Sequence, residues 1–349
     1  MNVNINNVDD LNKFCHHPDR VISYQDCIVM LKNAYCIDYN LYFNYNDSTY
    51  EQTFLMNQIL GNDVLNTISK NNIEFHKIKH YNKCVFMSTS FYDNFLHFIM
   101  ELFFDYVFYL ELKKFIPQLK FYSHNKTKFI ERVNKFGLLK LFNINSDVEN
   151  DLCEDHYTNT HYQIIIYPYK IFSEIRKCYR FNIYHRYCHY ANSYLDTYIN
   201  PEIKCHNYIY ISRRLRDNNK TIADQSRVLL NENALINKLK IYDFHEVFLE
   251  DYDKLEDKLY VLRNADIIIL QSSATCLLLS MVDLKNIVVL SGPYKISVFP
   301  WDHRNNILSI KNIRSDDIKI INKGNNVPWE LTPTNLIDIE NHIKLLKEK

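Results

Sequence analysis

The sequence predicts an α/β protein of two domains, each built around a largely parallel sheet. The chain has 349 residues, which exceeds what one ordinary hydrophobic core accommodates and favours two domains. Hydrophobic residues make up 47% and charged residues 23% of it, as is typical of a globular chain. Short apolar runs alternate with longer helical patterns, and this alternation is typical of βαβ units with parallel strands.

The individual elements follow from this alternation. Nearly continuous apolar runs indicate strands that are covered on both faces of a sheet. They lie at 84–88, 119–122, 163–167, 208–212, 245–249, 266–270 and 286–290. Helical patterns lie between many of them, at 94–115, 126–138, 174–198, 231–241, 254–264 and 274–283.

The domain boundary is expected near residues 195–206, in a polar and aromatic stretch that contains Pro201. This divides the chain into an N-terminal domain, 1–200, a C-terminal domain, 201–331, and a final helix, 332–349. In that helix, Leu336, Ile339, Ile343 and Leu346 are spaced to share one face, and Thr332 or Thr334 is suited to cap its start. The pattern leaves open which domain this helix packs against.

Composition narrows the classes of partner. Lys plus Arg equals Asp plus Glu, at 41 each, so no overall charge favours nucleic acid. The nine Cys form no CxxC pair, which favours reduced thiols over disulfides or a metal site. The start of the chain lacks the pattern of a signal peptide, and no apolar run reaches the roughly 18 residues of a membrane span. We therefore expect a cytoplasmic protein with no integral membrane segment and no bound metal.

The first candidate site follows the apolar strand 266–270, where Gln271 leads into Ser272, Ser273, Ala274 and Thr275. In a doubly wound sheet, such a strand-to-helix turn lies at the carboxyl edge, where ligands bind. The N–H groups and positive dipole of a helix start favour a phosphate there. The alternative is that Ser272 or Ser273 only caps the following helix.

The second candidate follows the strand 208–212, which ends at Ser212 and leads into Arg213 and Arg214. Arginines placed directly after a parallel strand would lie at the same edge as the serine turn. Their planar guanidinium groups pair with phosphate oxygens through two hydrogen bonds. The alternative is ordinary surface charge, which is the stronger interpretation for Arg216 and Lys220 farther along.

The third candidate is the mostly apolar helix in the N-terminal half. Its few polar residues, Asn94, His97, Glu101 and Asp105, are three or four apart and so would share one face of an α-helix. Polar groups on a nearly buried helix need partners or a wet cleft, and these types suit a general base or contacts to sugar hydroxyls. The alternative is an internal hydrogen-bond network.

Taken in order, these three elements resemble glycosyltransferase family 61, which includes plant xylosyl- and arabinosyltransferases and eukaryotic O-GlcNAc transferases. The resemblance covers roughly residues 84–295. It is carried by "NFLHFIME" from Asn94 to Glu101, by "YISRR" with the later "RVLLNENAL", and by "NADIIILQSSATCLL". It implies two Rossmann-like domains facing across a cleft, the GT-B arrangement. It also implies inverting transfer from a nucleotide-sugar, here a UDP-sugar, to a glycan or protein hydroxyl, with no metal or other cofactor.

The resemblance, together with the chemistry of the three candidate sites, gives expected roles to particular residues. Donor binding falls to the C-terminal domain, and the acceptor binds on the N-terminal side, near Asn94. Glu101 is the expected base, with His97 or Asp105 as its substitute. The residues expected to hold the donor and its leaving diphosphate are Arg213, Arg214, Arg227, Glu232, Ser272, Ser273, Ala274 and Thr275.

One segment departs from the family. Most members have Gly-Pro-His-Gly-Ala-Gly where this chain has Leu270 to Thr275. Hydroxyl groups could replace the His as phosphate donors, but without glycine the backbone approaches a ligand less closely. Two other classes therefore stay open. One is a non-catalytic nucleotide- or sugar-binding protein with a degenerate transferase fold, and the other is an interaction protein with an aromatic-rich surface.

Overall fold

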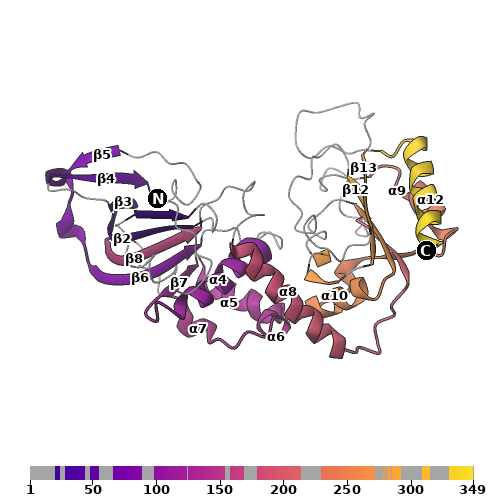
Figure 1. Ribbon diagram of the computed structural model, residues 1–349, viewed down its shortest axis with the longest axis horizontal. Helices are drawn as coiled ribbons and strands as arrows, with labels where there is room; N and C mark the ends of the chain where they lie inside the picture. Colours follow the sequence, from indigo (N-terminus) through magenta and orange to yellow (C-terminus); the bar gives the residue numbers. More distant parts are fainter. Residues whose placement is uncertain are drawn as a thin grey trace, which may run out of the picture. The chain divides into compact units, whose positions relative to one another are not determined.

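The computed structural model consists of two compact units, Met1–Tyr187 and Cys188–Lys349 (Figure 1). The division falls inside helix α8 (Tyr179–Thr197), whereas the sequence places a boundary after this helix. The structure describes residues 20–23, 28–43, 48–54, 66–88, 98–123, 125–153, 158–168, 179–213, 229–271, 278–279, 281–283, 285–291, 309–314 and 330–348.

Unit 1 contains an eight-stranded mixed sheet with the order β5-β4-β3-β2-β8-β6-β7, and β1 pairs with β2. Strand β6 pairs in parallel with β7 and β8, while the pairs among β1 to β5 and the pair β2–β8 are antiparallel. The strands are β1 (Arg20–Ser23), β2 (Ile28–Ile37), β3 (Asn40–Phe43), β4 (Thr49–Phe54), β5 (Asn66–Ser69), β6 (His80–Ser88), β7 (Lys120–Ser123) and β8 (Thr160–Pro168). The expectation of a largely parallel sheet is therefore wrong for this unit. Its antiparallel pairs all involve strands β1 to β5, which the sequence pattern did not predict.

The helices of unit 1 follow β6 and β7. A π-helical segment, η3 (Phe98–Phe103), continues directly into α4 (Phe104–Lys113). After β7 come α5 (Lys126–Lys135), α6 (Leu138–Leu141) and α7 (Val148–Asp151). Two short 3-10 turns, η1 (Lys70–Asn72) and η2 (Phe75–Lys77), precede β6. Among the described residues, the largest fully buried side chains are all Tyr or Phe, so much of the aromatic content lies in the core.

A buried carboxylate anchors this aromatic core. Asp151 accepts hydrogen bonds from the hydroxyl groups of Tyr106, at 2.8 Å, and Tyr109, at 3.1 Å. Ser146 and Lys113 also donate to it. Burial alone would raise the pKa of Asp151, but Lys113 and the donated hydrogen bonds outweigh it and lower that pKa. Because each polar group at this point has a partner, we read the cluster as structural.

Unit 2 contains a five-stranded parallel sheet with the order β10-β9-β11-β12-β13. Counted along the chain, this order is 2-1-3-4-5, one of the two common arrangements of doubly wound sheets. The strands are β9 (Tyr208–Ile211), β10 (His245–Val247), β11 (Ile267–Gln271), β12 (Asn286–Ser291) and β13 (Ser309–Arg314). The prediction of an α/β chain with a parallel sheet is confirmed here.

Helices cover both faces of this sheet. Helix α9 (Glu232–Lys240) and the final helix α12 (Pro333–Lys347) share one hydrophobic cluster with β9, β11 and β12. Helix α10 (Leu255–Arg263) follows the short turn η6 (Leu249–Asp251) and lies on the opposite face (Figure 1). None of the helices in the described ranges is long and apolar enough to cross a membrane.

The final helix packs against unit 2, which answers the question that its sequence leaves open. Thr332 caps it by accepting a hydrogen bond from the Asn335 backbone N–H at 3.1 Å, and the Thr332 backbone N–H donates in turn to Asn335 Oδ1 at 3.0 Å. Ile339, Ile343 and Leu346 are buried in the shared cluster and Leu336 packs against it. The predicted helix, its Thr332 cap and its apolar face are confirmed.

Two stacked histidines lie near the amino end of the sheet in unit 2. The rings of His206, before β9, and His245, the first residue of β10, have centroids 3.6 Å apart. Burial, with the nearby His245 and Lys204, lowers the pKa of His206 below its ordinary value of 6.5. The neutral ring is therefore the form that the folded protein favours.

This pair predicts that stability falls in mild acid. Because the pKa of His206 is lower in the folded than in the unfolded chain, the unfolded state takes up the proton first as the pH falls below about 6.5. The stabilising contribution is complete above that pH and is lost as the pH falls toward the lowered folded pKa. Urea unfolding at about pH 7.5 and pH 5.5 measures the loss, and His206→Phe, which keeps the stack but cannot be protonated, should reduce it. An equal loss in the variant would assign the pH dependence to other groups.

Candidate functional site

The candidate site lies at the carboxyl edge of the unit 2 sheet, above strands β9 and β11. These strands are neighbours, with Ile211 opposite Leu270. From β9 the chain crosses to β10 on one side, whereas from β11 it continues to β12 on the other side. In sheets of this order, ligands bind where the direction of the connections reverses, at the carboxyl ends of those two strands. The Arg213 and Gln271 positions lie there, one at the end of each strand.

A buried hydrogen-bond network joins these two strand ends to the start of α9. One oxygen of Glu232, Oε1, accepts hydrogen bonds from Tyr210 Oη and from Ser212 Oγ, both at 2.8 Å. The same oxygen accepts from the backbone N–H of Arg213 at 3.3 Å. Gln271 Nε2 donates to Tyr210 Oη at 3.1 Å. The first residue after β9 and the last residue of β11 are therefore fixed through one carboxylate.

Glu232, which accepts three hydrogen bonds of this network, is itself buried. Its exposed fraction is 5%, and it is the first residue of α9, where the positive end of the helix dipole favours a carboxylate. Asn231, just before it, exchanges two hydrogen bonds with the Leu331 backbone, at 2.8 and 3.0 Å, so the start of α12 holds the start of α9. Glu232 thus positions Arg213 and the strand ends through its Oε1.

The structure brings together two of the predicted donor-binding residues, Arg213 and Glu232. Sequence reasoning did not assign roles to Tyr210 and Gln271, which complete the network. One available signal was Gln271 itself, a polar residue that ends an apolar strand on the same face as Ile267 and Ile269. The remaining predicted donor-binding residues lie outside the described residues: Arg214, Arg227, Ser272, Ser273, Ala274 and Thr275.

The structure describes only part of the predicted polar face formed by Asn94, His97, Glu101 and Asp105 in unit 1. Asn94 and His97 lie outside the described residues, and Glu101 lies within η3, where its backbone alone is described. Asp105 in α4 is fully buried, with an exposed fraction of 0%, and it accepts a hydrogen bond from Ser88 Oγ at 2.7 Å. Ser88 ends β6, so Asp105 lies beneath the carboxyl end of that strand.

The π-helical segment changes the geometry on which this polar face was predicted. Residues four apart share a face in an α-helix. The η3 segment is a π-helix, in which hydrogen bonds join residues five apart, so its turn is wider and residues four apart no longer align. The one-face argument for Glu101 and Asp105 assumed an α-helical period throughout 94–115, and the segment Phe98–Phe103 does not have it. Such π-helical turns are frequent at functional sites.

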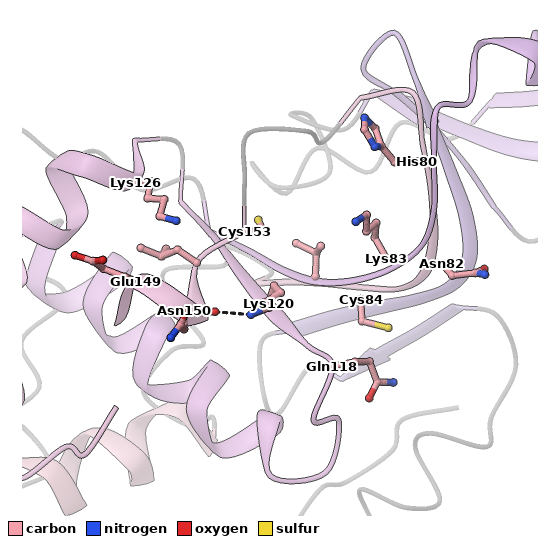
Figure 2. Close-up of a pocket in the computed structure, with 12 residues that line it drawn as sticks. His80, Asn82, Lys83, Cys84, Gln118, Lys120, Lys126, Glu149, Asn150 and Cys153 are labelled. Carbon is pink, nitrogen blue, oxygen red and sulfur yellow. Dashed lines mark hydrogen bonds between the residues drawn. The ribbon is translucent and has the colours of Figure 1, made fainter. Parts of the chain in front are cut away.

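Unit 1 also has an open pocket of about 650 Å³ (Figure 2). Lys83, Lys120 and Lys126 line it with one acid, Glu149, so its charge would favour an anion. The Lys120 ammonium group bonds to the Asn150 carbonyl. Among the described residues that line it, none was predicted as a site residue, and the lysines and Glu149 lie largely at the surface. The edge of unit 2 therefore stays the stronger candidate.

Comparison with protein-family models and with curated proteins finds no match to this chain. The functional interpretation consequently depends on the strand order of unit 2 and on the residues at its carboxyl edge.

Proposed function

We propose that the protein is a glycosyltransferase of the family 61 type. It transfers a sugar from a nucleotide-sugar, a UDP-sugar in the first instance, to a hydroxyl group of a glycan or glycoprotein. The reaction inverts the anomeric centre and needs no metal. In this proposal the two units form the GT-B arrangement, with the donor on unit 2 and the acceptor on unit 1.

The observation that carries the proposal is the strand order of unit 2 together with Arg213. A parallel sheet with the order 2-1-3-4-5 binds its ligands where its connections reverse, and the arginine-bearing segment begins there. The hydrogen bond from the Arg213 backbone to Glu232 fixes the start of that segment at the edge. A guanidinium group at this point is suited to the diphosphate of a donor.

The proposed mechanism is a single displacement at the anomeric carbon. A base removes the proton of the acceptor hydroxyl while its oxygen attacks that carbon, and the bond from the carbon to the diphosphate oxygen breaks. Arginines and helix N–H groups stabilise the charge on the departing diphosphate. Glu101 is the proposed base. Asp105, buried and hydrogen-bonded to Ser88, supports the neighbouring segment instead of acting on substrate.

Arg213→Ala is expected to weaken binding of UDP roughly 10- to 100-fold, because a hydrogen bond to a charged group contributes about 1.5–3 kcal/mol. Calorimetric titration of the wild type and the variant with UDP measures the change. Lys285→Ala is the matched control, because Lys285 lies before β12, at the opposite edge of the same sheet, and pairs with Asp266. Equal UDP affinity in all three proteins would remove Arg213 from the donor site.

The runner-up is a nucleotide- or sugar-binding protein without catalysis, which the departure at Leu270 to Thr275 favours. It predicts the same response to Arg213→Ala but no turnover. Release of UDP from UDP-sugars in the presence of glycan acceptors separates the two. Binding without release over a broad acceptor panel would favour the non-catalytic alternative.

A further inference from the structure

One atom of the Gln271 side-chain amide is buried without a hydrogen-bond partner among the described residues. The exposed fraction of this residue is 2%. Its Nε2 donates to Tyr210 Oη, whereas its Oε1 is buried and has no hydrogen-bond partner in the described part of the chain. Native proteins rarely keep a buried acceptor unpaired, because the loss of its hydrogen bond to water is not compensated.

The network fixes which atom of the amide is left over. The Glu232 carboxylate can only accept, so the single hydroxyl proton of Tyr210 goes to it. Burial and the Glu232 charge hold the pKa of Tyr210 well above its ordinary value of 10, which keeps that proton in place. The Tyr210 oxygen can then only accept from Gln271, and this requires the NH₂ group of the amide. If the amide were flipped, Gln271 Oε1 would face Tyr210 Oη, and neither oxygen would have a proton to donate to the other.

The end of β11 therefore holds a buried, unpaired acceptor near the sheet edge where the proposed nucleotide-sugar binds. An acceptor cannot pair with a phosphate oxygen, which also accepts, but it pairs with a hydroxyl or an N–H group. We propose that Gln271 Oε1 accepts a hydrogen bond from a hydroxyl or N–H group of the bound nucleoside, while Arg213 holds the phosphates. This inference rests on the proposed function and deepens it, because it makes Gln271 a specificity-determining residue for the nucleoside.

The test compares the wild type with Gln271→Met, which is similar in size and apolar, in titrations with UDP, 2′-deoxy-UDP and inorganic pyrophosphate. The variant should bind UDP about tenfold more weakly, the effect of one neutral hydrogen bond, and bind pyrophosphate as the wild type does. If the ribose 2′-hydroxyl is the donor, the two proteins bind 2′-deoxy-UDP equally. If a base N–H is the donor, the tenfold difference persists with 2′-deoxy-UDP.

Stability without ligand provides the second measurement. Because the variant no longer buries an unpaired acceptor, its thermal unfolding midpoint should not fall below that of the wild type. Tyr210→Phe is the contrasting variant: it removes a donor from Glu232 and the partner that orients the Gln271 amide, so it should lower both the midpoint and the affinity for UDP.

The outcomes separate the inference from the function on which it rests. A wild type that binds UDP and a Gln271→Met variant that binds it equally well would overturn the inference and leave the proposed function in place. A destabilised Gln271→Met variant with unchanged UDP affinity would give Gln271 a purely structural role. A wild type that binds no UDP would overturn the proposed UDP donor and the inference together.

Discussion

Glu232→Ala is expected to lower the free energy of unfolding of unit 2 by about 3 kcal/mol and to weaken binding of UDP by up to roughly 10- to 100-fold. Three donors converge on one carboxylate oxygen: the buried hydroxyls of Tyr210 and Ser212, and the part-buried backbone N–H of Arg213. Each donor left unpaired costs about 1–3 kcal/mol, and neighbouring losses are not additive. UDP binding weakens because Arg213 loses a hydrogen bond that holds its backbone at the sheet edge.

Urea unfolding and UDP titration measure the two parts of this prediction. Glu232→Gln is the matched control: it keeps one carbonyl acceptor of the same reach and should lose only about 1 kcal/mol. If Glu232→Ala unfolds at the wild-type urea concentration, the network does not stabilise unit 2. If it is destabilised but binds UDP normally, Glu232 does not position the donor site.

Glu101→Gln is expected to reduce sugar transfer by roughly 10²- to 10⁴-fold, the usual contribution of a general base. The amide has nearly the shape of the carboxylate but cannot take the proton of the acceptor hydroxyl. Binding of UDP, which the proposal assigns to unit 2, should be unchanged. Rates of UDP release with acceptor present, together with UDP titration, measure both effects.

Glu111→Gln is the control for this experiment. Glu111 is on the continuing helix α4, where it pairs with Lys114 and Arg186 and accepts a hydrogen bond from Tyr187. Because the proposal gives Glu111 no contact with substrate, its replacement should change transfer by less than about twofold. Transfer by Glu101→Gln at the wild-type rate would show that another group is the base and would leave the donor site untouched.

The sequence predicted unit 2 well because its central strands are buried on both faces. Runs at 208–212, 245–249, 266–270 and 286–290 correspond to β9, β10, β11 and β12. Continuous apolar runs are typical of such strands. The fifth strand, β13, was missed because it lies at the sheet edge and reads SIKNIR, with polar residues that a two-sided core would exclude.

Unit 1 was predicted less completely because most strand pairs of its sheet are antiparallel. Strands such as β4 (TYEQTF) and β5 (NTIS) mix polar with apolar residues, as strands with one wet face do. A search for continuous apolar runs passes over them. Strand β2 was missed although it is long and mostly apolar, because Lys32 and Asn33 interrupt its run.

Arg213 was predicted from its place after a strand end, and Glu232 was predicted from the family resemblance. The structure places both near the carboxyl edge of unit 2. The contacts among Tyr210, Glu232 and Gln271 join three elements far apart in the chain. Such contacts depend on strand order, which the local pattern does not specify. The π-helical turn at Phe98–Phe103 was likewise beyond an argument that assumes an α-helical period.

The central claim is that the carboxyl edge of unit 2 binds a nucleoside diphosphate. Thermal unfolding of the wild type with UDP, GDP, CDP and dTDP, with and without a divalent metal ion, tests it most directly. One nucleotide, with UDP expected, should stabilise the protein by about 2.7 kcal/mol at one hundred times its dissociation constant, and it should do so without metal. Unchanged unfolding with all four nucleotides would contradict the account.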